Sequence, residues 1–185
     1  DRDEVRLLVD GPDGREHAAF WELGRFLRAG DLLIVNTSAT LPAAVEGSVN
    51  GRDAVVHFST QRDDGTWVVE LRLPDGSGPI LDARAGEAVH LCGGGVLHLS
   101  GPNDGIGRGP VRLWRAIVDN VGQMTDYLAA HGRPITYGYV EGQWPLSDYQ
   151  TVFATDPGSA EMPSAGRPFT NRLVTELVAK GVGFA

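Results

Sequence analysis

The residues best suited to bind a ligand lie between Tyr149 and Thr170, where YQTVFATDPGSAEMPSAGRPFT combines small residues, prolines and hydroxyl groups. Alternation of β-branched and aromatic residues predicts a strand over 149–154, and the cluster 156–159 predicts a turn. A second run of small residues, 163–166, leads to Thr170, a suitable N-cap for the helix that follows. Small residues let a ligand approach the backbone, and N–H groups at a helix start favour a carboxylate or phosphate. The alternative is an ordinary connection between a strand and a helix.

A second polar group follows the apolar run 32–35, because Asn36, Thr37 and Ser38 come directly after this predicted buried strand. In open α/β sheets, ligands gather beyond the carboxyl ends of the strands. Asn36 and Thr37 would then face the same crevice as Ser164. The other interpretation is that Asn36 and Ser38 only make hydrogen bonds within a turn. The residues alone leave both interpretations open.

Other patterns in the chain indicate little further chemistry. The five histidines are scattered without the spacing of metal ligands, so we expect no metal site. The stretch 105–109, GIGRG, resembles a phosphate-binding loop, but no helix is predicted after it. Asp148, Asp156 and Glu161 are the carboxylates nearest the small-residue loop, and each is a candidate general base. Most loop carboxylates are simply solvated, so the catalytic residue stays unassigned.

Composition and charge exclude several classes of protein. A formal net charge of −8 over 185 residues argues against a general nucleic-acid binder, because such binding depends on neutralising phosphates. The single cysteine, Cys92, rules out an internal disulfide and fits a reducing cytoplasm, where we expect the protein to be. We expect Cys92 to be a small buried or edge residue. The sequence contains no run of eighteen apolar residues, so we predict no membrane-spanning helix. We expect the protein to be a monomer.

The middle of the chain, residues 46–118, has no helical periodicity. Short apolar runs with period two alternate with turn clusters such as 62–65 and 74–76. Five or six short strands of this kind predict a small antiparallel barrel or sandwich. We therefore expect a β-barrel domain over 46–118, inserted into the remainder of the chain.

The two flanking segments, 1–45 and 119–185, show an αβ pattern and are expected to form one domain. The first segment predicts strands at 5–9 and 32–36 around a short amphipathic helix at 20–27. The second predicts helices at 122–131 and 171–180.

The final helix, 171–180, has recognisable features at its end. Glu176 and Lys180 are spaced for an i,i+4 ion pair, and Gly181 suits the position after the helix. The chain then stops at Ala185, where a new strand should begin, and we expect the C-terminal part of this αβ domain to be missing.

Four stretches of the chain share a recognisable pattern: 1–9 (DRDEVRLLV), 20–42, 148–154 (DYQTVFA) and 158–170 (GSAEMPSAGRPFT). Together they resemble the S-adenosylmethionine:tRNA ribosyltransferase-isomerase family of queuosine synthesis. Their order and spacing also resemble that family, with a β domain between the second and third stretches. The resemblance covers most of the αβ part of the chain.

The resemblance implies a mixed α/β (α+β) protein of two domains: an αβ barrel-like catalytic domain and an inserted small antiparallel β-barrel domain. It implies an enzyme that moves the ribosyl group of S-adenosylmethionine to 7-aminomethyl-7-deazaguanine in tRNA, giving epoxyqueuosine and releasing adenine and methionine. S-adenosylmethionine would be a co-substrate, with no prosthetic group and no metal, and tRNA the second partner. The implied substrate-binding residues are Asn36, Thr37, Ser38, Tyr149, Gln150, Thr151, Ser159, Pro163, Ser164, Ala165, Gly166, Arg167, Phe169 and Thr170.

The chain departs from the family pattern at polar positions. Thr37 replaces an aspartate, Ala39 and Ala44 replace arginines, and Pro168 replaces a histidine, while Arg167 replaces a leucine. Losing two arginines removes bidentate recognition of phosphate or carboxylate, and losing the histidine removes an acid or base that works at neutral pH. Two alternatives therefore stand beside the family reaction: a divergent paralogue with another acceptor, or a catalytically silent module that binds protein or RNA.

Overall fold

The computed structural model describes residues 1–12, 14–103, 110–136, 142 and 144–185. The stretch 105–109 that resembles a phosphate-binding loop lies outside these residues.

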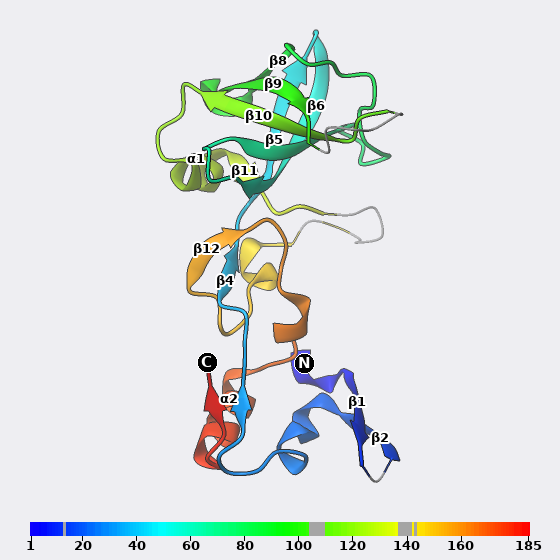
Figure 1. The fold of residues 1–185 in the computed structure, drawn as a ribbon, viewed down its shortest axis with the longest axis vertical. Helices are drawn as coiled ribbons and strands as arrows, with labels where there is room; N and C mark the ends of the chain where they lie inside the picture. The colour runs from blue at the N-terminus through cyan, green and yellow to red at the C-terminus, as the bar shows by residue number, and fades with distance from the viewer. Residues whose placement is uncertain (13, 104–109, 137–141, 143) are drawn as a thin grey trace. The chain divides into compact units, whose positions relative to one another are not determined.

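The described chain forms two compact units (Figure 1). The αβ unit consists of Asp1–Ala39, Gln150–Asp156 and Met162–Ala185, and the barrel unit consists of Thr40–Tyr149 and Pro157–Glu161. The barrel unit is wider than the expected insertion at 46–118.

Six antiparallel strands close into a ring in the barrel unit. Their order is β5-β6-β7-β10-β9-β8, and β8 pairs back to β5. This arrangement confirms the antiparallel β-barrel that the sequence predicts, and closure leaves none of these six strands as an open edge. The strands are β5 (Ala44–Val49), β6 (Arg52–Gln61), β7 (Trp67–Arg72), β8 (Ala88–Leu91), β9 (Val96–Pro102) and β10 (Leu113–Asp119).

The interior of the barrel is filled by apolar side chains that face each other across the strands. Val56 lies opposite Leu71 and Phe58 opposite Val69, and all four are fully buried. Phe58 also packs edge-to-face on Trp67, with ring centroids 5.5 Å apart. Aromatic pairs in this geometry stabilise a core beyond the area they bury. The barrel therefore has a continuous core of its own.

Helix α1 (Met124–His131) and the short strand β11 (Gly132–Arg133) also belong to the barrel unit. The sequence predicts this helix at nearly these bounds but assigns it to the αβ domain. The turn from α1 into β11 packs closely on the chain before β5, because a Cβ on Gly132 would lie 1.9 Å from the carbonyl oxygen of Pro42. β11 then pairs with β5, next to the barrel ring.

The αβ unit contains a β-hairpin, a parallel strand pair and one α-helix. β1 (Arg6–Gly11) pairs with β2 (Gly14–Ala19), and β3 (Leu32–Leu33) pairs in parallel with β13 (Gly183–Phe184). Helix α2 (Asn171–Ala179) confirms the predicted final helix, and Gly181 adopts the left-handed conformation (φ +91°) expected after its end. The core consists of Phe169, Leu173, Leu177 and Val182.

The predicted buried strand at 32–36 is wrong in its extent and its burial. Only two residues of this segment pair with β13, and Leu32 and Ile34 are 58% and 77% exposed. Because alternate residues of a strand point to opposite faces, Leu33 reaches the core while its neighbours do not. Within the part of the chain that the structure describes, the face carrying Leu32 and Ile34 has no covering element.

Two further details of the αβ unit differ from expectation. The predicted α-helix at 20–27 is instead a 3₁₀ helix, Phe20–Arg25. The residue at its N-cap position, Ala19, has no side-chain oxygen that could accept a hydrogen bond from the first turn of a helix. Glu176 pairs with Arg172 at 3.4 Å instead of Lys180, whose ammonium group donates to the carbonyl oxygen of Gly24.

The remaining short elements complete the chain. Strands β4 (Ser38–Thr40) and β12 (Asp156–Ser159) pair with each other, and further 3₁₀ helices span Arg2–Glu4, Cys92–Gly94, Leu146–Tyr149 and Ser164–Gly166. Cys92 is exposed, contrary to a buried position, and its carbonyl oxygen accepts a hydrogen bond from the Tyr127 hydroxyl. Among the described helices, none has both the length and the apolar character needed to cross a membrane.

Candidate functional site

The segment Asn36–Ser38 forms a turn directly after β3. The side-chain oxygen of Asn36 accepts a hydrogen bond from the backbone N–H of Ser38 at 2.8 Å, which is an Asx turn. The carbonyl oxygen of Thr37 accepts from the N–H groups of Thr155 and Asp156, at 2.9 and 3.1 Å. Asn36 and Thr37 are exposed and Ser38 is half-buried. The polar group after β3 therefore lies beside the chain that leads out of the YQTVFA stretch.

The predicted strand at 149–154 is wrong. Tyr149 ends a 3₁₀ helix, and the next residues form a turn in which the Thr151 hydroxyl accepts from the N–H of Phe153 at 3.3 Å. Extended structure begins instead at β12, inside the predicted turn cluster, because β12 finds a partner in β4. Pro157 is compatible with this strand because the pair has only two strands and both are edges.

Thr151 and Gly166 meet in the αβ unit. A Cβ on Gly166 would lie 3.2 Å from the Thr151 methyl group, and Thr151 is 7% exposed. The absence of a side chain at Gly166 thus lets the small-residue loop pack closely on the YQTVFA stretch. The backbone carbonyl of Gln150 is held by the Arg2 guanidinium at 2.6 Å. These contacts bring together two stretches that the sequence places in the ligand site.

The small-residue loop presents several of its members to solvent. Ser164, Ala165 and Arg167 are exposed, whereas Pro163 and Gly166 are half-buried. The Ser164 hydroxyl donates to the carbonyl oxygen of Met162 at 3.4 Å. Ser164 and Arg167 are therefore the loop residues with polar groups that a ligand could reach.

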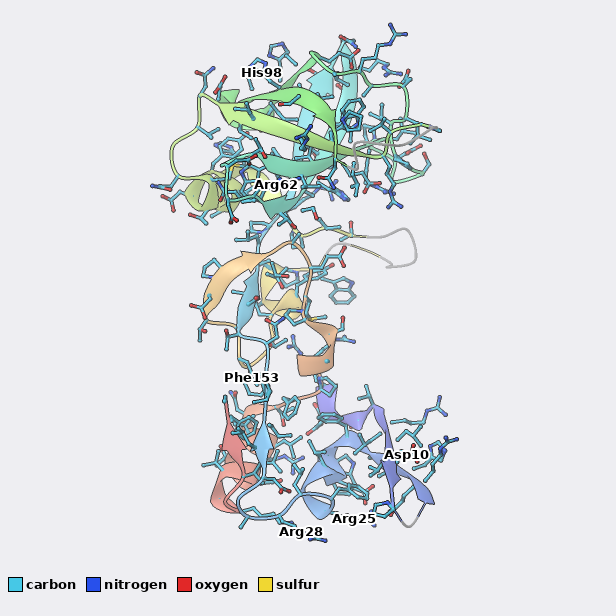
Figure 2. The ribbon with its side chains drawn as sticks, viewed as in Figure 1. Asp10, Arg25, Arg28, Arg62, His98 and Phe153 are labelled. Atoms are coloured by element: carbon cyan, nitrogen blue, oxygen red, sulfur yellow. The ribbon has the colours of Figure 1, made fainter. Side chains whose placement is uncertain are left out.

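Phe169 lies at the centre of an aromatic cluster. It is 8% exposed, and its ring packs edge-on against Phe20 at 5.0 Å and Phe153 at 5.1 Å (Phe153 is labelled in Figure 2). Phe153 in turn lies 5.7 Å from Phe184 of β13. The cluster fixes the end of the loop against the small core of the αβ unit.

The start of helix α2 is occupied by side chains of the protein itself. The Thr170 hydroxyl accepts from the N–H of Leu173 at 3.2 Å, which confirms Thr170 as the N-cap. That hydroxyl also donates to Asp3, a carboxylate only 5% exposed, at 3.3 Å, and Arg172 pairs with the same oxygen of Asp3 at 3.2 Å. A negative group near a helix N-terminus is favourable. Here Asp3 supplies that charge, where the sequence predicts the anion of a ligand.

Tyr149 and Ser159 belong to the barrel unit. The Tyr149 hydroxyl is buried and finds no hydrogen-bond partner among the described residues, while its backbone carbonyl accepts from the Thr40 hydroxyl at 2.8 Å. Ser159 donates its hydroxyl to the carbonyl oxygen of Glu161 at 2.5 Å. The predicted substrate-binding residues thus divide into twelve in the αβ unit and these two in the barrel unit.

The structure gives little support to the carboxylates predicted as general bases, and none of the described residues form a metal site. Asp156 is exposed and accepts from the Thr155 hydroxyl at 2.9 Å. Over the described ranges, no three histidine, cysteine or carboxylate side chains gather in the way that a metal ion needs. His57 is buried in the barrel unit, and burial lowers its pKa to about 4, so it is neutral at pH 7.

The barrel unit also contains a pocket that sequence reasoning did not identify. It has a volume of about 310 Å³ and lies where α1, β11 and the chain before β5 meet. In the sequence, Arg133 and Trp144 each stand directly before a proline, and the structure leaves Trp144 exposed. The lining residues are Pro42, Ala129, Gly132, Arg133, Pro134, Thr136, Trp144, Pro145 and Leu146.

Comparison with known proteins gives one family. The family model described as "Queuosine biosynthesis protein" matches residues 1–185. The S-adenosylmethionine:tRNA ribosyltransferase-isomerase of Moorella thermoacetica is 32% identical over 197 residues, covering 100% of this chain and 52% of that protein. The protein of the same name from Thermus thermophilus is 30% identical, covering 98% of this chain and 52% of its own length.

The similarity extends to a solved structure. A crystal structure of S-adenosylmethionine tRNA ribosyltransferase from Thermotoga maritima is 21% identical and covers 100% of this chain and 50% of its own, with a TM-score of 0.34, too low to bear on the fold. The chain spans about half the length of the curated relatives it matches.

Proposed function

Because the chain belongs to the queuosine biosynthesis protein family, we propose that it is part of a cytoplasmic enzyme that transfers the ribosyl group of S-adenosylmethionine to 7-aminomethyl-7-deazaguanine in tRNA. The observation that carries this proposal is the family match over all 185 residues. The names of the relatives, S-adenosylmethionine:tRNA ribosyltransferase-isomerase, supply the donor, the acceptor and the reaction class. S-adenosylmethionine is then a co-substrate that is consumed.

The S-adenosylmethionine site of this proposal lies in the αβ unit, around the small-residue loop and the turn Asn36–Ser38. Support comes from the close packing of Gly166 on Thr151 and from the exposed polar groups of Ser164 and Arg167. Arg167 offers a guanidinium group, which suits the carboxylate of the methionine part of the donor. Asn36 and Thr37 offer uncharged hydrogen-bonding groups on an exposed turn.

The decisive test is adenine release from S-adenosylmethionine by the protein at its full length. We expect release that depends on tRNA bearing 7-aminomethyl-7-deazaguanine, because only the ribosyl transfer couples loss of adenine to this acceptor. Adenine can be measured by chromatography, with unmodified tRNA as the control. Binding of S-adenosylmethionine without release would favour a divergent paralogue with another acceptor. Absence of both, from folded protein, would favour the catalytically silent module.

A variant tests the location of the donor site. Ser164 is exposed, so Ser164→Tyr fills the loop without disturbing a core. We expect this variant to lose S-adenosylmethionine binding, measured by titration calorimetry, at an unchanged melting temperature. Ser77→Tyr, at an exposed position in the barrel unit, is the matched control and should bind as the parent does. Equal affinity in the two variants would assign the loop a structural role only.

A further inference from the structure

A second pocket lies at one end of the barrel ring. It has a volume of about 400 Å³, within the range of small-molecule sites. Its described lining comes from the end of β6, the start of β7, the end of β10, the start of α1 and β12, all in the barrel unit. The mouths of β-barrels are common places for ligand sites. We call this pocket the mouth pocket.

The strand registers show which side chains face the mouth pocket. Trp67, the first residue of β7, belongs to the barrel core. Gln61, the last residue of β6, lies opposite Trp67, and so does Ala116 of β10. Opposite residues share one face of a sheet, and every second residue along a strand returns to that face. Gln61 and Val118 therefore lie on the inner face of the barrel at its end.

A β-bulge turns the Gln61 side chain inward. Strand β6 carries one extra residue between Phe58 and Thr60 where it pairs with β7. With regular alternation, Thr60 would share the inner face with Phe58, and Gln61 would point outward. Bulges are frequent at the rims of barrels, where they redirect a side chain. Here the bulge brings an amide group to the mouth pocket.

The start of helix α1 supplies a second amide. Gln123 stands at the N-cap position of α1, lines the mouth pocket and is exposed. Its side chain makes no capping hydrogen bond, and glutamine is not among the residues that usually cap a helix. A primary amide offers both a carbonyl acceptor and N–H donors. Two such groups, from β6 and from α1, are thus available to a ligand.

The remaining lining is uncharged and largely apolar. None of the described lining residues has an ionisable side chain. Trp67 and Leu128 are buried, and Met124 is half-buried beside them. The charged residues Arg62 and Asp126 are near in the sequence but do not line the pocket. An ion would lose hydration here without gaining a partner of opposite charge, so the lining suits an uncharged ligand with apolar faces and a polar edge.

We infer that the mouth pocket binds an adenine base, with the amides of Gln61 and Gln123 bonded to its edges. Adenine presents an acceptor, N7, beside a donor, the 6-amino group, and a primary amide matches this pair in a bidentate way. Guanine is usually read by arginine or lysine and cytosine by a carboxylate, and the described lining has none of these. The apolar residues would contact the faces of the base, as they do in proteins that hold an unstacked base.

An extended peptide fits this place less well. Peptides that add to a sheet need an open strand edge. Strands β6, β7 and β10 each have a neighbour on both sides in the ring. The inference goes beyond the proposed function, because an adenine site in the barrel unit does not depend on ribosyl transfer. The base could come from a free nucleoside, from S-adenosylmethionine or from RNA, since the chemistry of recognition is the same.

The first test is titration calorimetry with adenosine, using the protein at its full length. We expect guanosine, and purine riboside, which lacks the 6-amino group, to bind about fivefold to a hundredfold more weakly, because a correct bidentate pair discriminates by this amount. Adenosine 5′-monophosphate should bind like adenosine, because no cationic side chain of the described lining is present to hold its phosphate.

Variants of Gln61 test the contact directly. Gln61 is exposed, so its replacement should leave the melting temperature unchanged. Gln61→Ala and Gln61→Glu should each weaken adenosine binding about fivefold or more, because the glutamate keeps the shape but loses the N–H donors. Arg62→Ala is the matched control, because Arg62 is the next residue and is exposed (labelled in Figure 2) but does not line the pocket. It should bind adenosine like the parent.

Competition against adenosine identifies the source of the base. Displacement by S-adenosylmethionine would assign the site to nucleosides, and displacement by a short oligoadenylate alone would assign it to RNA. Three results would overturn the inference: no adenosine binding up to its solubility limit, guanosine binding as tight as adenosine binding, or equal affinity in the parent, Gln61→Ala and Gln123→Ala. The assay involves no release of adenine from S-adenosylmethionine. Failure of this inference and failure of the proposed function can therefore be told apart.

Discussion

The barrel unit and the αβ unit differ in how completely they bury their apolar side chains. Among the described residues, the main core of the barrel unit contains 23 buried apolar residues, whereas that of the αβ unit contains four. The barrel strands form a ring, so their hydrogen bonds and inner faces are complete. The αβ unit exposes the apolar side chains Leu8, Trp21, Leu32, Ile34 and Val178, each more than half exposed. Stability in the barrel unit is thus collective, while the αβ unit depends on a few contacts.

The parallel pair β3–β13 makes the contrast clear. Parallel strands usually have both faces covered, because their crossover helices pack on the sheet. Here helix α2 and the phenylalanine cluster supply one face, through Leu33 and Phe184, and the other face carries exposed Ile34. The small-residue loop and the turn Asn36–Ser38, which are proposed to bind S-adenosylmethionine, lie in this more weakly packed unit. The proposed donor site is therefore supported by a small core.

The strongest test of the comparison removes one buried leucine from each unit. Leu71 and Leu173 are 0% and 1% exposed, so Leu71→Ala and Leu173→Ala each delete the same buried atoms. Such changes cost about 2–5 kcal/mol, and the cost is highest where the surroundings cannot collapse. We expect Leu71→Ala to reach the upper part of this range, because a closed ring of strands cannot close over the cavity.

Hydrogen exchange followed by mass spectrometry locates the two effects. Leu71→Ala should accelerate exchange in β6, β7 and β10, and Leu173→Ala should do so in α2 and β13 while the barrel stays protected. If either variant accelerated both sets of peptides equally, the chain would unfold as one cooperative unit and the comparison would fail.

The barrel has one weak point of its own, His57. Its pKa falls to about 4 in the folded protein, mainly because it is buried, with the charge of Arg72 as a further cause. The unfolded chain binds this proton at about pH 6.5, so unfolding takes up a proton between pH 6.5 and pH 4. Stability is therefore complete above pH 6.5 and is lost as the pH falls toward 4, by up to about 3 kcal/mol.

Urea unfolding at pH 7 and pH 4.5, followed by tryptophan fluorescence, measures this loss. His57→Gln removes the titrating group, and its stability should change less over the same interval. The carboxylates titrate in parent and variant alike, so the difference between the two isolates the histidine. Identical losses in both proteins would mean that protonating His57 costs the fold nothing.

The difference between the units also explains what the sequence could predict. The barrel follows from patterns of period two such as Trp67–Val69–Leu71, because each strand meets its hairpin neighbour a few residues away. The strand at Asp156–Ser159 could not be predicted, because its partner β4 lies more than a hundred residues earlier. The residues of this strand, Asp-Pro-Gly-Ser, are typical of a turn and so predict a turn when they are considered alone. The exposure of Leu32 and Ile34 escaped prediction for the same reason, since burial depends on what covers a face.

The candidate sites divide in the same way. The small-residue loop could be located from its composition, and the N-cap at Thr170 from the residue type and the helix pattern that follows it. The use of Asp3 at that helix start could not, because Asp3 and Thr170 stand 167 positions apart.

The smallest expected effect comes from the cap of helix α2. Thr170→Ala removes the hydroxyl that accepts from the N–H of Leu173 and donates to Asp3. Loss of an N-cap costs about 1 kcal/mol, so we expect exchange of the α2 amides to accelerate about fivefold. Thr170→Ser keeps the hydroxyl and should exchange like the parent, while the barrel amides should not change in either variant. A loss of this size is measurable because the αβ unit has so small a core. If exchange of the α2 amides did not change, burial of Leu173 and Leu177 would be sufficient to hold the helix. The idea that the αβ unit depends on a few contacts would then be refuted.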